Sequence, residues 1–292
     1  MPLVIRQFVA LMVLLLAVSC AAPGEDAPSV ASMAVSIAPD QAAIGTPIEV
    51  RYRFEMLPGA SMPQGRHLVF VHAVDSSGQV VWTDDHEPNV PTERWQAGRP
   101  VEYTRTMFVP RVTAGGPVDL RIGLYSGTTG ARVPLQGEPE GNRAYRGATL
   151  EVRPDPAAIF VAYREGWHNP EVGETLGREW RWSGKVGHLL FRNPKRPAEL
   201  WLELDQPVAG AATPQEVELR IGGAVVDSFP LDGQAITVRR TSLTPEAMGV
   251  SETVELEILP AQSFTPANVP ALGNADRREL GVRVFNAYVA TP

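Results

Sequence analysis

Residues 46–55 read TPIEVRYRFE, and the alternation of apolar and polar side chains in this stretch decides the fold. Every second position is apolar: Ile48, Val50, Tyr52 and Phe54. Because neighbouring side chains of a strand point to opposite faces, the stretch predicts a β-strand with one face in a core and one in water. Such one-sided strands are typical of antiparallel sheets.

The same alternation recurs on both sides of this stretch. Residues 67–86 (HLVFVHAVDSSGQVVWTDDH) predict two strands joined by a turn at residues 75–78, where Asp, Ser and Gly tolerate turn geometry. Further alternating segments follow as far as Val152. Some seven strands within residues 33–153 predict a β-sandwich with an immunoglobulin-like layout.

Residues 153–156 (RPDP) mark a domain boundary, because proline does not fit inside a central strand. Beyond it the alternation resumes, for example in residues 215–221 (QEVELRI), and predicts a second, jelly-roll-like sandwich over residues 157–292. A single helical turn is expected at TPEAMG, with Thr244 as its cap. The sequence thus predicts an all-β protein of two antiparallel β-sandwich domains.

The N-terminal residues predict export and lipidation. Residues 1–19 form a secretion signal, whose apolar run is shorter than the about 20 residues that a membrane-spanning helix needs. Residues 17–20 (AVSC) resemble the lipobox of bacterial lipoproteins, which implies acylation of Cys20 and a lipoprotein signal peptide. An ordinary signal peptide that happens to contain a cysteine is the alternative. Residues 20–32 predict a flexible tether from the membrane to the first domain.

A lipid on Cys20 would anchor the protein to a membrane on the extracytoplasmic side of the cell envelope. Ala21 stands where Asp, by resemblance to Gram-negative sorting rules, would retain a lipoprotein at the inner membrane, so the outer membrane is expected if the host has one. The net charge of −7 opposes a polyphosphate partner, so no nucleic acid is expected. No cofactor is expected either.

Motifs in both predicted domains point to a family context. The first carries VFVHAVD at 69–75, DDHEP at 84–88, Trp95 before Gly98, and GLYSGTTGAR at 123–132. This set resembles β-sandwich modules attached to the extracytoplasmic side of bacterial membrane glycosyltransferases. The second carries GW at 166–167 with Glu171, RW at 181–182, GG at 222–223, and DRRELGV at 276–282. This set resembles a module found beside polysaccharide-related glycosyltransferases, which implies a polysaccharide context.

Residues 177–184 (GREWRWSG) raise a question about ligand binding. On a strand, Trp180 and Trp182 share one face, whereas Glu179 and Arg181 share the other. Indoles stack on the apolar faces of sugar rings and flanking charges can bond hydroxyls, so the set has the composition of a glycan platform. The same tryptophans also suit the core between two sheets, with Trp182 the more buried. Both interpretations stay open at this point.

The candidate carbohydrate-binding residues are Trp167, Glu171, Trp180, Arg181, Asp276 and Arg277. Trp167 lies in a turn-rich stretch, where binding groups often occur, although it also suits a plug over one end of the sandwich. Asp276 and Arg277 precede the last strand and either join the ligand site or form ion pairs that fix a loop.

Metal binding and catalysis have weaker signals. If the hairpin turns at Ser76 and Ser77, His67 falls opposite His86 with Asp84 diagonal to both, and these three side chains suit zinc. Histidines that merely face each other on a surface are the alternative, and no metal is expected. The chain carries no motif of a nucleophilic, metal-dependent or phosphate-binding enzyme, so no catalytic residue is predicted.

The sequence therefore predicts a non-catalytic, lipid-anchored envelope protein. It is expected to bind or organise cell-surface carbohydrate through the second domain. The alternative is a scaffold subunit of an envelope complex, in which sheet edges and loops contact another protein.

Overall fold

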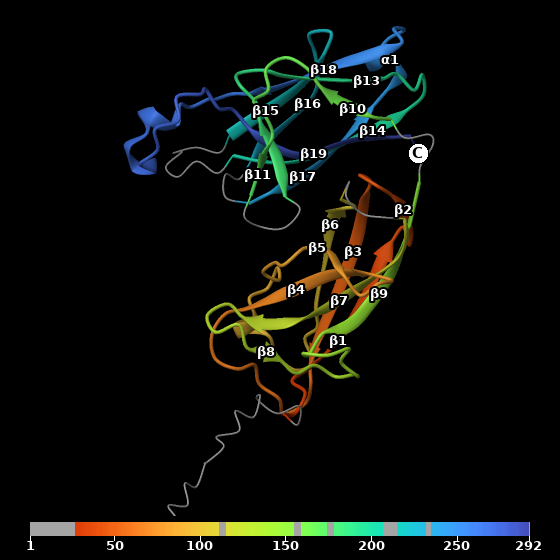
Figure 1. The fold of residues 1–292 in the computed structure, drawn as a ribbon, viewed down its shortest axis with the longest axis vertical. Helices are drawn as coiled ribbons and strands as arrows, with labels where there is room; N and C mark the ends of the chain where they lie inside the picture. Colours follow the sequence, from red (N-terminus) through yellow and green to blue (C-terminus); the bar gives the residue numbers. More distant parts are fainter. Residues whose placement is uncertain are drawn as a thin grey trace, which may run out of the picture.

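The computed structural model describes residues 27–110, 115–154, 159–173, 178–206, 215–231 and 235–291. The predicted signal peptide and Cys20 lie outside these residues. The predicted all-β class is confirmed: strands dominate, and the one α-helix in the described ranges, α1 (Pro245–Met248), is a single turn. Two groups of sheets stack along the long axis of the molecule (Figure 1).

The first group packs a three-stranded sheet against a six-stranded one. The smaller sheet has the order β1 (Ala31–Ala38), β3 (Pro47–Met56), β6 (Val101–Phe108). The larger has the order β2 (Gln41–Ala43), β9 (Tyr145–Arg153), β7 (Gly116–Ser126), β4 (His67–Asp75), β5 (Val80–Thr83), with β8 (Arg132–Val133) paired to β7. All pairs are antiparallel except β2 with β9. This division of strands matches an immunoglobulin-like layout.

The opening stretch of the sequence lies in β3 as predicted. Its apolar side chains are buried in the first core, and the charged ones between them are exposed or half-buried. The first strand begins at Ala31, two residues before the expected start of the domain, and Val30 already donates a backbone hydrogen bond to Pro134 O. The short 3-10 helix η1 (Thr92–Arg94) precedes β6.

The second group consists of two five-stranded sheets. One has the order β10 (Val161–Tyr163), β13 (Gly187–Arg192), β18 (Thr253–Pro260), β15 (Gln215–Ile221), β16 (Ala224–Leu231). The other has the order β11 (Glu171–Val172), β12 (Glu179–Trp182), β19 (Arg283–Ala290), β14 (Ala198–Asp205), β17 (Thr237–Leu243). From β12 to β19, the chain crosses between the sheets at nearly every connection, as in a jelly roll.

The local features predicted for this half are confirmed. The β15–β16 hairpin turns at Gly222 and Gly223, both at positive φ. Thr244 caps α1 by accepting a hydrogen bond of 3.2 Å from the amide of Ala247. Two 3-10 turns, η2 (Pro266–Asn268) and η3 (Pro270–Leu272), lie between β18 and β19.

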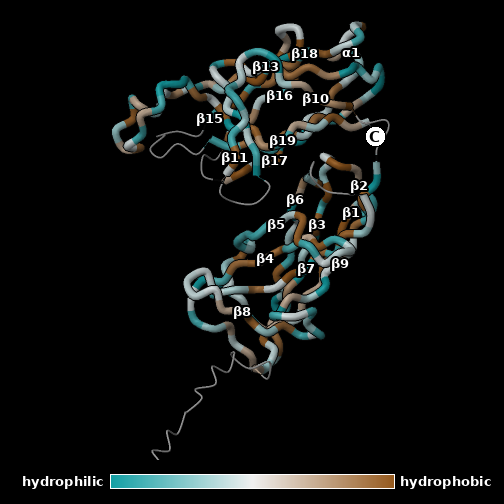
Figure 2. Tube along the Cα trace, in the orientation of Figure 1, coloured by the Kyte–Doolittle hydropathy of each residue, from teal (hydrophilic) through white to brown (hydrophobic). Residues whose placement is uncertain are grey.

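Hydrophobic stretches lie along strands of both sandwiches (Figure 2).

The described strands pair only within residues 31–153 or within residues 161–290, so residues 154–160 join two separate pairs of sheets. The interface between the two sandwiches consequently contains side chains rather than a shared sheet. Within the described ranges, no helix has the length and apolar character needed to cross a membrane.

Candidate functional site

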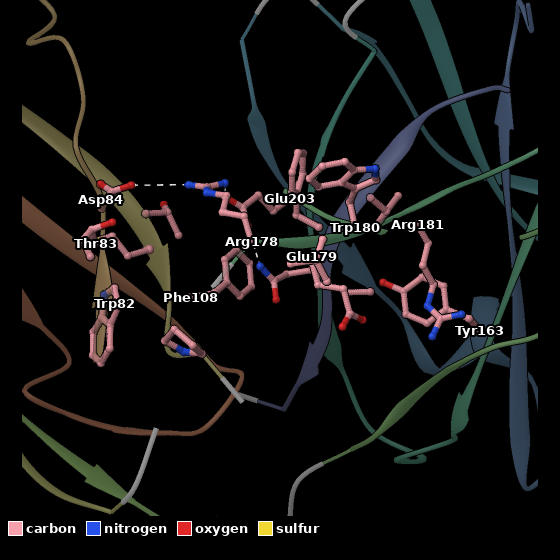
Figure 3. Close-up of a pocket in the computed structure, with 18 residues that line it drawn as sticks. Trp82, Thr83, Asp84, Phe108, Tyr163, Arg178, Glu179, Trp180, Arg181 and Glu203 are labelled. Atoms are coloured by element: carbon pink, nitrogen blue, oxygen red, sulfur yellow. Dashed lines mark hydrogen bonds and ion pairs between the residues drawn. The ribbon is translucent and has the colours of Figure 1, made fainter. Parts of the chain in front are cut away.

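A cleft of about 380 Å³ lies between the two sandwiches (Figure 3). The first sandwich lines it with the end of β5, from Trp82 to Asp84, and with the end of β6, including Phe108. The second sandwich contributes residues of the β11-β12-β19-β14 sheet, together with Tyr163 of β10. Its principal lining residues there are Arg178, Trp180, Arg181, Glu203, Phe285 and Asn286.

Two aromatic rings form the floor of the cleft. Trp180 on β12 and Phe285 on β19 meet edge to face, with ring centroids 6.0 Å apart. The guanidinium of Arg283 lies 4.8 Å from the Trp180 ring and 4.9 Å from the Phe285 ring. Two hydrogen bonds of 2.8 and 2.7 Å hold Arg283 against buried Asp205. The rings therefore rest on a fixed charged support rather than on mobile loops.

A β-bulge in β19 places two consecutive residues in the cleft. Glu203 pairs with Asn286 and Leu204 with Val284, which leaves Phe285 without a partner on β14. The extra residue lets both Phe285 and Asn286 face the cleft, whose lining also includes Val284 and Ala287, while the side chain of Val289 stays in the core. The amide of Asn286 donates a hydrogen bond of 2.6 Å to Glu203 Oε2.

An ion pair reaches across the cleft from one sandwich to the other. Nη1 of Arg178 lies 3.0 Å from Oε1 of Glu203 on its own sandwich, and Nη2 lies 3.7 Å from Oδ1 of Asp84 on the first (Figure 3). Asp84 is only 7% exposed and receives two further hydrogen bonds, of 2.9 and 3.0 Å, from Arg105. The carboxylate of Asp84 is thus fixed in position where it faces the cleft.

Behind Asp84 lies a buried polar cluster in the first sandwich. His86 Nδ1 lies 2.8 Å from the backbone oxygen of Asp84, and Nε2 lies 2.8 Å from the hydroxyl of Tyr103. Tyr103 stacks on Tyr52 with centroids 5.0 Å apart. Burial, reinforced by the positive charge of Arg105, lowers the pKa of His86 to about 4. Because neutral His86 can only donate to the carbonyl of Asp84, its Nε2 accepts from Tyr103.

The buried histidine predicts a loss of stability in acid. Between about pH 6.5 and pH 4, the unfolded chain binds a proton at His86 that the folded chain excludes, so protonation favours unfolding. The free energy of unfolding is expected to fall by about 3 kcal/mol as pH falls through this window. Urea unfolding at several pH values, compared with a His86→Gln variant, measures the effect. An equal pH slope in the variant would contradict it.

The cleft includes only two of the predicted carbohydrate-binding residues, Trp180 and Arg181. Glu171 lies instead beside a smaller hollow of about 220 Å³ that Asp276 and Trp182 also line. The carboxylate of Glu171 accepts hydrogen bonds of 3.3 Å from the Trp180 indole and 2.6 Å from Arg278.

Asp276 and Arg277, both predicted as ligand partners, do not share a hollow, because Asp276 lines the smaller one and is paired with Arg278. Arg278 donates hydrogen bonds to both Asp276 and Glu171, and these bonds raise the pKa of its guanidinium. The hydrogen bonds from Arg278 in turn lower the pKa of the Asp276 carboxyl. Arg277 is exposed and lines neither hollow. The alternative proposed for this segment, ion pairs that fix a loop, describes the arrangement.

The structure separates the three tryptophans by role. Trp182 is 7% exposed and packs edge to face on Phe264, whereas Trp180 is half-buried and faces the cleft. Trp167 packs against the second core, and its indole N–H donates a hydrogen bond of 2.9 Å to the backbone oxygen of His188. It lines neither of the two hollows, and its packing against the core is the arrangement expected of a plug.

The predicted opposition of His67 and His86 is wrong. The turn after Asp75 has three residues rather than two, since Asp75 pairs with Gln79, and a bulge at Val81 adds one more. His86 therefore pairs with Val69, and His67 lies opposite Ser126 on β7. Across the described ranges, no three His, Cys, Asp or Glu side chains are grouped as metal ligands, and Asp84 is paired with Arg105 instead.

Sequence reasoning missed half of the cleft. Phe108, Glu203, Phe285 and Asn286 carried no signal, because alternation assigns residues to faces of one sheet and says nothing of a second domain or of a bulge. Arg178 stood in the quoted GREWRWSG stretch, and Asp84 in the DDHEP motif, but nothing in the chain indicated that the two would meet.

No family model matches the sequence, and no curated protein matches it. Among solved structures, the tandem CBM22 domains of Paenibacillus barcinonensis Xyn10C are similar at 13% identity over 85% of this chain and 79% of that one, with a TM-score of 0.30. The partial N-terminal region of enterococcal surface protein is 10% identical over 82% and 85%, with a TM-score of 0.27. Collagen adhesin from S. aureus is 8% identical over 90% and 97%, with a TM-score of 0.18. Function is therefore inferred from the geometry of the cleft.

Proposed function

We propose that this chain is a non-catalytic protein of the bacterial cell envelope that binds carbohydrate in the cleft between its two sandwiches. The observation that carries the proposal is the pairing of the Trp180 and Phe285 rings with the polar side chains of Arg178, Glu203 and Asn286. Ligand sites combine apolar surface with a few polar groups that fix orientation. This cleft has both, and residues of both sandwiches supply them.

The chemistry of a sugar fits this arrangement. A pyranose has apolar C–H faces, which pack on aromatic rings, and hydroxyls at its edge, each of which donates and accepts. Oxygens of Glu203 and Asn286 supply acceptors beside the rings, and the guanidinium of Arg178 supplies donors. The sequence predicted binding through the second domain alone, whereas the proposed site also includes residues of the first domain.

The non-catalytic assignment rests on how the cleft carboxylates are held. A glycosidase needs two carboxyl groups across the scissile bond, one of them able to deliver a proton. Asp84 is clamped by Arg105, and Glu203 is bonded to Arg178 and Asn286. Both carboxylates are therefore held in place by partners within the chain itself.

The proposed location follows from the N-terminal sequence. Acylation of Cys20 would attach the chain to the membrane, and residues 20–32 would let the sandwiches reach surface polysaccharide. In a host with an outer membrane, Ala21 supports that membrane as the address.

Replacing Trp180 with Ala is expected to weaken glycan binding by tenfold or more, because loss of the ring contact removes about 1.5 kcal/mol. Binding of the full-length protein in detergent to an array of polysaccharides measures the effect. Phe160→Ala is the matched control, since this ring is 82% exposed and lines neither hollow. Equal binding by the two variants would contradict the proposal.

A scaffold role in an envelope complex is the competing outcome. Among the described residues, exposed large apolar side chains include Val80 on β5, Val172 on β11 and Val225 on β16, and Phe160 and Val250 in connecting segments. Protein interfaces usually gather such residues in one patch. No single described strand or connection presents more than one of these side chains, and binding to no glycan on the array would favour the scaffold.

A further inference from the structure

We infer that the cleft selects neutral saccharides over acidic ones. The inference rests on the proposed function and adds the charge of the ligand to it. It follows from the way in which the charges around the aromatic floor are already matched to one another.

Arg178 is the guanidinium closest to the middle of the cleft, and it already has two carboxylate neighbours. Glu203 lies 3.0 Å away and Asp84 3.7 Å away, one on each sandwich. A uronate carboxylate that approached Arg178 would become a third negative charge around a single positive one. The two resident carboxylates are mostly buried, so water screens this repulsion poorly.

The neighbouring guanidiniums are also committed. Arg105 forms two hydrogen bonds with Asp84, and Arg283 forms two with Asp205. Each of these pairs satisfies its carboxylate in a two-pronged geometry that a ligand would have to break. Within the described part of the chain, the guanidiniums nearest the two aromatic rings and Asp84 are therefore already paired with carboxylates.

Among the residues that the structure describes, Arg181 is the other guanidinium that lines the cleft. It lies 5.1 Å from the Tyr163 ring, at the end of the cleft away from Asp84 (Figure 3). Glu179, two residues earlier on β12, shares its face of the strand and is exposed. Arg181 therefore lies against an aromatic ring at the far end of the cleft from Asp84, with an exposed carboxylate on the same face of its strand.

What the floor leaves available suits hydroxyls. Each oxygen of Glu203 accepts one described hydrogen bond, from Arg178 or from Asn286, and carboxylate oxygens can accept more than one. Hydroxyl groups donate to such oxygens without adding charge. The ligand class that matches this site is a neutral polysaccharide or oligosaccharide.

The test compares polymers that differ only in charge. Polygalacturonate, alginate and hyaluronate are immobilised beside the neutral polymers made by reducing their carboxyl groups, together with neutral glucans, mannans and xylans. The full-length protein in detergent is expected to bind the best neutral polymer at least tenfold more tightly than any acidic one. Reduction of an acidic polymer should increase its binding. Glu203→Gln, which removes one resident charge with little change in shape, should raise binding to acidic polymers about fivefold.

The outcomes separate this inference from the proposed function. Preference for an acidic polymer, abolished by Trp180→Ala, would overturn the inference and leave the carbohydrate site standing. Unchanged acidic binding in Glu203→Gln would overturn the explanation by resident charge. Failure to bind any polymer would overturn both proposals.

Discussion

Gly166→Ala is expected to unfold the second sandwich. Gly166 has φ +78°, and a Cβ atom built on it would lie 1.8 Å from the backbone oxygen of Val186. The obstacle is main chain rather than a flexible side chain, so relief requires β13 and its neighbours to shift. We expect a loss of at least about 4 kcal/mol in the free energy of unfolding, measured by urea unfolding of the full-length protein.

Gly222→Ala provides the control for this prediction. Gly222 also has positive φ, at +57°, but a Cβ atom there would meet nothing within 4 Å. Its cost is the left-handed backbone alone, about 1 kcal/mol. Similar losses for the two variants would show that conformation, rather than the close approach to Val186, explains the need for glycine at 166.

Trp182→Ala is expected to destabilise the second sandwich by about 3 to 5 kcal/mol, because a buried indole leaves a cavity that the sheet cannot close. Trp182 is 7% exposed and packs on Phe264 beneath the segment between β18 and β19. Thermal and urea unfolding of the full-length variant measure the change.

Trp180→Ala is the natural comparison, since the two tryptophans share one short strand and one sheet face. Because Trp180 is half-buried, its replacement by Ala should lower the free energy of unfolding by about 1 kcal/mol yet remove most of the glycan binding. Trp182→Ala should show the reverse wherever the variant remains folded. A result in which both variants lose stability equally would mean that Trp180 is also core, and would weaken the binding proposal.

Alternation predicted the strands because burial on one face is a property of each strand by itself. The β3 stretch, the hairpin at Gly222 and Gly223, and the cap at Thr244 all depend on residues close in sequence. The same holds for the all-β class and for the expectation that Trp182 is more buried than Trp180.

Several motif glycines turned out to serve packing. A Cβ atom at Gly123 would lie 2.5 Å from the Phe70 ring, and one at Gly281 would lie 2.3 Å from the backbone oxygen of Gly184. With Gly166, these residues belong to the GLY, GW and LGV motifs. The motifs therefore report close approaches within the sandwiches, and they carry little information on a ligand.

The cleft escaped prediction for two physical reasons. Bulges shift the register by one residue without a sequence signal, which moved His86 away from His67 and turned both Phe285 and Asn286 outward. The meeting of Asp84 with Arg178 depends on how two separately folded sandwiches lie against each other, and no local pattern encodes that placement.

Because both sandwiches line the cleft, neither sandwich alone would form the complete binding site. Cutting the chain between residues 153 and 161 would be expected to leave two folded sandwiches and no complete cleft, since one fragment would keep Trp180 and Phe285 and the other Asp84 and Phe108. Any rearrangement of the gene that exchanged one half for a foreign module would be expected to conserve folding while erasing recognition.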